Sequence, residues 1–117
     1  MRYLVMIYSE ESASPPAPEQ LAEIRTTYRA YTTMLRDRGA FLDGDELQPT
    51  SSATTIRIRD GRTLITDGPF AETKEALGGF YLIEAADLDE AIALAQQCPG
   101  ARWGSIEVRP IEARSGS

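Results

Sequence analysis

The opening segment, residues 2–8, limits the possible folds most strongly. Every residue after Arg2 is apolar or aromatic, and two glutamates follow shortly after the run. The run is far shorter than the roughly 20 apolar residues of a membrane span. As a β-strand it would place its odd-numbered side chains on one face and its even-numbered side chains on the other. A strand covered on one face only would alternate polar and apolar residues, so we predict a strand covered on both faces.

Two helices are predicted. Residues 18–38 begin with a proline at a favoured first helical position and end before Gly39, a typical helix stop. Between these ends, apolar residues recur at spacings of three and four and form one stripe, Leu21, Ile24, Tyr28, Tyr31 and Leu35. The second helix begins at Asp87, with Glu90 three residues later in a capping-box-like pattern, and ends before Pro99.

A β-hairpin is predicted between residues 54–59 and 62–66. Asp60 and Gly61 join these two β-branched runs, and both residue types tolerate the positive φ of a two-residue hairpin turn. The resulting register pairs Ile56 with Ile65, Ile58 with Thr63 and Arg59 with Arg62. Opposed arginines favour a bound anion or a partner's acids, although arginines at a hairpin tip also extend into water and protect an edge strand.

Further strands are predicted at residues 40–47, 80–84 and 104–109. The order is then strand, helix, strand, hairpin, strand, helix, strand, which is an α+β fold of ferredoxin-like βαβ pattern with both helices on one face of the sheet. The other face needs a second copy of the chain to cover it, so we predict a homodimer. Residues 1–112 form one domain, and residues 113–117 form a disordered tail.

Composition excludes several classes of function. Twelve Lys and Arg against eighteen Asp and Glu give a net charge of -6, which disfavours nucleic acid and membrane surfaces as partners. The lone cysteine, Cys98, allows no internal disulfide and fits a reducing, cytoplasmic location. The chain has no histidine, the commonest general base and metal ligand. We therefore expect neither a metal nor a cofactor.

The run Asp-Gly-Pro-Phe-Ala-Glu-Thr-Lys-Glu at residues 67–75 resembles the signature of the DGPF branch of the YCII-related proteins. The resemblance continues through residues 77–84, 87–91, 98–100 and 106–110. It implies a dimeric α+β barrel, in a family most of whose members have no established activity. In the wider group a histidine–aspartate pair is proposed as catalytic, and one relative is a dehydrochlorinase acting on a chlorinated hydroxyquinol. Without histidine, only the acidic member has a counterpart here, Asp67.

Three charged residues of this run are candidates for chemistry. Asp67 and Glu72 are the catalytic candidates, because two carboxylates in an apolar cleft would have their pKa values pushed apart. Lys74 would favour the ionised form of the nearer carboxylate and would bind ligand. The alternative is structural: Asp67 supports the turn at Gly68, and Glu72 and Lys74 are solvated.

Aromatic side chains are the remaining ligand-binding candidates: Tyr3, Tyr81 and Phe70. On central strands, such residues line a ligand cavity or fill the core and the dimer interface. Two functions stay open at this point. The first is small-molecule binding in a cleft, extending to cofactor-free proton transfer or elimination. The second is a non-catalytic interaction or regulatory module, which the resemblance links to sigma factors.

Overall fold

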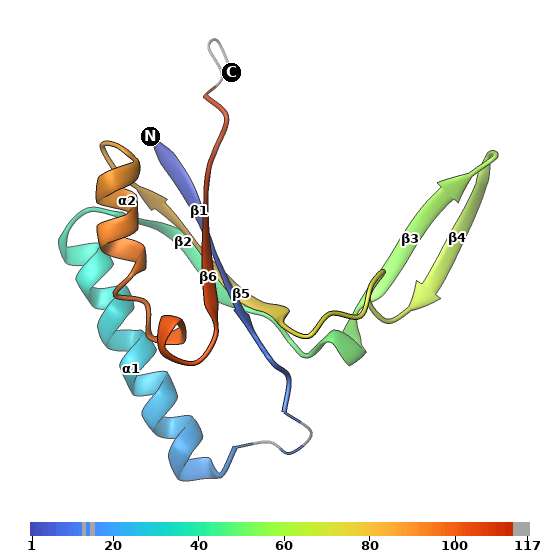
Figure 1. The fold of residues 1–117 in the computed structure, drawn as a ribbon, viewed down its shortest axis with the longest axis horizontal. Helices are drawn as coiled ribbons and strands as arrows, with labels where there is room; N and C mark the ends of the chain where they lie inside the picture. Colours follow the sequence, from blue (N-terminus) through green and yellow to red (C-terminus); the bar gives the residue numbers. More distant parts are fainter. Residues whose placement is uncertain (13, 15, 114–117) are drawn as a thin grey trace.

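The computed structural model describes residues 1–12, 14 and 16–113, so residues 114–117 of the predicted tail lie outside it. Figure 1 shows the arrangement of the elements. In chain order they are β1 (Arg2–Ser9), α1 (Pro18–Asp37), β2 (Phe41–Glu46), the 3₁₀ turn η1 (Thr50–Ser52), β3 (Thr54–Arg59), β4 (Arg62–Asp67), β5 (Ala76–Glu84), α2 (Leu88–Ala95), the 3₁₀ turn η2 (Pro99–Arg102) and β6 (Ser105–Pro110). The predicted order of strands and helices is confirmed.

Four strands form one antiparallel sheet in the order β2-β5-β1-β6. Helix α1 follows β1 and helix α2 follows β5. Together with the strand order, this is consistent with a ferredoxin-like α+β fold. At the centre, Val5 lies between Tyr81 of β5 and Val108 of β6. The sheet is open at β2 and β6, and the described residues contain no closed barrel. The dimeric barrel therefore stays a prediction.

Both helices lie on the same side of this sheet (Figure 1). The core between helices and sheet contains Val5, Leu35 and Ile83, each completely buried, together with Tyr3 and Tyr31. These strand residues share a face because side chains alternate along a strand. In the predicted stripe of α1, only the C-terminal part is fully buried, because the first turns of the helix extend beyond the sheet (Figure 1).

The opposite face of the sheet carries a strip of apolar side chains: Leu4, Met6, Phe80 and Leu82. The register places them side by side, with Leu4 opposite Leu82 and Met6 opposite Phe80. On edge strand β2, Asp43 and Asp45 pair with the two β5 members of the strip. No helix lies over this face in the described part of the chain (Figure 1). We call it the uncovered face.

Strands β3 and β4 form a separate two-stranded sheet, which we call the arm (residues 54–67). Its predicted register, from Ile56 opposite Ile65 to Arg59 opposite Arg62, is confirmed. Asp60 and Gly61 have φ values of 52° and 76°, as a two-residue hairpin turn requires. The arm extends from the sheet on the side away from the helices (Figure 1). The radius of gyration is accordingly 16.5 Å, against about 13 Å for a compact domain of this length.

Candidate functional site

A cleft of about 1050 Å³ opens where the first turns of α1 extend beyond the sheet. Four segments line it: the end of β1 with the following connection, the start of α1, the segment before β5, and the residue after η2. The lining residues are Ser9, Glu10, Ser12, Ser14, Pro16, Gln20, Ile24, Lys74, Glu75 and Trp103. Three of these residues, Pro16, Ile24 and Trp103, are apolar and the other seven are polar or charged, so the cleft is large enough for a small molecule but more polar than the usual ligand pocket.

Local structure accounts for how the cleft is built. Ser9 ends β1 and pairs with the first residue of β5, which brings the segment carrying Lys74 and Glu75 to the mouth of the cleft. On α1, Gln20 accepts a hydrogen bond at 3.3 Å from the backbone N–H of Ala17, which caps the first turn. The end of one strand, the start of another and a capped helix thus form three of its walls.

The charged groups of the cleft are two carboxylates and one ammonium group. Lys74 Nζ lies 3.6 Å from Glu10 Oε1, and both side chains are largely exposed, so this ion pair adds little to stability. Glu75 Oε1 accepts a hydrogen bond of 2.7 Å from the hydroxyl of Ser105 on β6. That bond fixes the orientation of one carboxylate, and no hydrogen bond from the described residues reaches its second oxygen.

Trp103, the sole tryptophan of the chain, forms an apolar wall of the cleft and is 54% exposed. The glycines on η2 and just after it hold this segment in place. A Cβ on Gly104 would lie 2.0 Å from the backbone oxygen of Tyr8, and one on Gly100 would lie 2.7 Å from Tyr28 Oη. Only glycine allows η2 and the start of β6 to pack so closely on β1 and α1.

Behind this wall, Cys98 is buried among tyrosines of α1 and β5. Desolvation by burial raises the pKa of the Cys98 thiol, so the reactive thiolate is disfavoured. Burial likewise raises the pKa values of Tyr28 and Tyr31 above their usual range. Tyr31 donates its hydroxyl to the backbone oxygen of Leu94 at 2.9 Å. This group of residues is part of the core, and its hydroxyls are structural.

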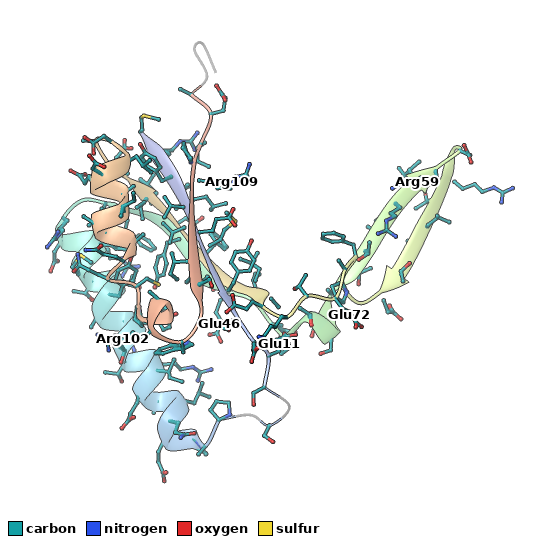
Figure 2. All side chains as sticks on the ribbon, viewed as in Figure 1. Glu11, Glu46, Arg59, Glu72, Arg102 and Arg109 are labelled. Atoms are coloured by element: carbon teal, nitrogen blue, oxygen red, sulfur yellow. The ribbon has the colours of Figure 1, made fainter. Side chains whose placement is uncertain are left out.

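The predicted charged residues do not come together. Lys74 lines the cleft, whereas Asp67 and Glu72 are exposed and are not among the residues that line it. Figure 2 shows Glu72 at the base of the arm, far from Arg59 at its tip. Phe70, in the same segment, is 78% exposed. Of the residues predicted within 67–75, only Lys74 therefore lies in the cleft.

The two predicted tyrosines lie in the core. Tyr3 is 2% exposed and Tyr81 is 7% exposed. The Tyr81 hydroxyl shares a 2.8 Å hydrogen bond with the hydroxyl of Thr32 on α1, and the ring packs edge-on against Tyr31. Neither tyrosine lines the cleft, so both occupy the places that the alternative, structural interpretation assigned to them.

Sequence reasoning missed three cleft residues, Glu10, Glu75 and Trp103. Trp103 carried a usable signal, because a lone tryptophan between Arg102 and Gly104 belongs to no apolar stripe. The two glutamates carried none, since each resembles any solvated glutamate of an acidic chain. Within the described residues, no three acidic or cysteine side chains gather in a way that would hold a metal ion. No helix in that part of the chain is long and apolar enough to cross a membrane.

Comparison with known proteins agrees with this fold. The family described as YCII-related domain matches residues 1–114. The chain belongs to the YCII-related family. An uncharacterised protein of Rhizobium meliloti (strain 1021) is 40% identical to it over 114 residues, which cover 95% of this chain and 92% of the relative. The YCII-related assignment thus spans the sheet, both helices and the arm.

Proposed function

We propose that this protein, as a member of the DGPF branch of the YCII-related family, binds a small hydroxylated aromatic molecule in the cleft beside Trp103. The observation that carries the proposal is the half-exposed indole beside two carboxylates. An aromatic ring stacks on an indole face, and each ring hydroxyl donates to a carboxylate oxygen. Phenols and quinols combine these two features.

The charge of the cleft supports a neutral hydroxylated ligand over a simple anion. Its lining carries Glu10, Glu75 and Lys74, and Lys74 is already paired with Glu10. A ligand carboxylate would meet this excess of negative charge, whereas a hydroxyl donor finds acceptors. If the bound molecule loses a proton, Glu10 and Glu75 are the acceptors in reach, and Asp67 and Glu72 are not.

We also propose that the protein forms a homodimer through the uncovered face. Within one chain, Met6 of the apolar strip is buried, but Leu4, Phe80 and Leu82 are only partly buried. Packing two such faces against each other would remove the strip from water, which stabilises a dimer by roughly 25 cal/mol for each Å² of apolar surface buried. Glutamate in place of Phe80 should therefore give a one-chain mass in light scattering at micromolar concentration. A one-chain mass for the wild type would contradict the dimer.

Fluorescence of Trp103 tests the cleft directly, because no other tryptophan contributes. Titration with phenol, catechol and hydroquinone should quench it and raise the melting temperature. Glu75→Gln should weaken binding about tenfold, since a charged acceptor makes a hydrogen bond stronger by about 1.4 kcal/mol. Glu72→Gln is the matched control, outside the cleft, and should bind like the wild type. No response to any of the three compounds, or an equal loss in both variants, would refute the proposal.

A further inference from the structure

The arm has two chemically different faces. The register places Ile56, Ile58 and Ile65 on one face, and these side chains are 64%, 65% and 68% exposed. The opposite face carries Arg57, Arg59 and Arg62 with Leu64, which is 47% exposed. Three isoleucines on one face of a hairpin form an exposed apolar patch, and such patches commonly mark interaction surfaces.

None of the residues that the structure describes covers these isoleucines. An isolated two-stranded hairpin is at best marginally stable in water, and it gains stability by packing a hydrophobic face against something else. The arm extends away from the body (Figure 1), on the same side of the sheet as the uncovered face. Arm and uncovered face therefore both point to the space where the proposed dimer would place a second copy.

The charges of the arm and of the rest of the chain indicate what binds the isoleucine face. The arm holds three arginines and two aspartates and is cationic by one charge, whereas the rest of the chain holds nine Lys and Arg against sixteen Asp and Glu and is anionic by seven. Acids also border the uncovered face, where Asp43 and Asp45 lie on edge strand β2 beside the apolar strip. A second copy thus offers both an apolar strip and the acids that complement the arm's arginines.

We propose that the arm is a clasp that grips a second copy of this chain. The isoleucine face packs on the partner, and the long arginine side chains reach the acids of the partner's β2 edge. The proposal rests on the proposed dimer and goes beyond it, because packing through the uncovered face alone requires no arm. It also assigns a role to the paired arginines at the tip, whose repulsion the partner's acids relieve.

Two neighbouring residues give a matched test in the full-length protein. Ile65→Gln places an uncharged polar group on the isoleucine face, and Thr66→Gln places the same group on the arginine face without changing its charge. Sedimentation equilibrium should show a dimer dissociation constant at least tenfold higher for Ile65→Gln and within about threefold of the wild type for Thr66→Gln. The Trp103 signal reports that the body of the protein remains folded.

The outcomes separate the clasp from the proposals on which it rests. If Phe80→Glu is monomeric while Ile65→Gln dimerises like the wild type, the clasp is refuted and the sheet-to-sheet dimer stands. A wild type that is monomeric refutes both, and ligand binding by the cleft is judged separately by its own titration. If Thr66→Gln weakens the dimer as much as Ile65→Gln does, the isoleucine face is not the contact and the clasp is refuted.

Charge exchange provides a second measurement that does not depend on the isoleucines. One chain carries Arg57→Glu and Arg59→Glu, and the other carries Asp43→Lys and Asp45→Lys. Each alone should dimerise more weakly than the wild type, and an equimolar mixture should give the heterodimer as its main species in native mass spectrometry. A statistical mixture of the two homodimers and the heterodimer would overturn the proposal.

Discussion

Gly104 offers a quantitative test of how the cleft wall is built. Its substitution by alanine would place a Cβ 2.0 Å from the Tyr8 backbone oxygen and 3.1 Å from the Tyr8 carbonyl carbon. Because the obstacle is backbone in the central strand, rotation of a side chain cannot relieve the clash. The start of β6 must move by about 1 Å or more, which weakens its pairing with β1 and displaces Trp103. Overpacking of this kind costs about 1–3 kcal/mol, and we expect the upper end of that range.

The control is Gly78→Ala on β5, where a new Cβ would lie 3.9 Å from the Ile7 backbone oxygen, an ordinary contact. This variant should be as stable as the wild type or up to about 1 kcal/mol more stable, because alanine restricts the unfolded chain. Urea unfolding followed by far-UV circular dichroism and by Trp103 fluorescence measures both variants. For a chain of this length, a loss of 3 kcal/mol lowers the melting temperature by roughly 12 °C. A Gly104→Ala variant within about 0.5 kcal/mol of the wild type would refute this account of the wall.

Two further predictions concern carboxylates. The free energy of unfolding of Asp67→Asn should lie within about 0.5 kcal/mol of the wild-type value, and the Trp103 response to ligand should be kept, because Asp67 is exposed outside the cleft. Loss of the response with unchanged stability would restore Asp67 as a site residue. Glu11 accepts the hydroxyl and backbone N–H of Thr50, which lower its pKa below 4.5. The stabilisation by ionised Glu11 is therefore present above pH 4.5 and is lost as the pH falls through the lowered pKa. The melting temperatures of the wild type and Glu11→Gln should differ at pH 7 and converge in acid, once the pH is below that lowered pKa. A difference that stays constant with pH would contradict this assignment.

The parts of the fold that could be predicted from the sequence are those that short-range chemistry determines. Asp60 and Gly61 specify the hairpin turn, and the turn specifies which residues pair across the arm. Helix α1 begins and ends where Pro18 and Gly39 indicate, because both act on the backbone of the nearest turn. The two apolar faces of β1 likewise follow from the unbroken run of apolar and aromatic residues 3–8.

The cleft could not be predicted in this way, because it depends on contacts between distant segments. Glu10, Ile24, Glu75 and Trp103 lie on four segments that become neighbours only when α1 packs on the sheet and η2 packs on β1. The separation of the arm from the sheet was also not evident. It depends on the two connections at its base, where Gly68 with φ 94° donates its backbone N–H to Ala53 at 2.7 Å.

The structure suggests a role for the motif at residues 67–75 other than that of supplying a pair of catalytic carboxylates. It begins at the base of the arm, where Gly68 accepts the hydroxyl of Thr55 at 2.8 Å, and it ends at Lys74 and Glu75 in the cleft. Near its end, Thr73 donates its hydroxyl to the backbone oxygen of Glu75 at 2.6 Å. The motif is thus the junction between the proposed clasp and the proposed ligand site. A partner that grips the arm acts on one end of a nine-residue segment whose other end carries cleft residues, so ligand affinity and dimer affinity should change together by linkage.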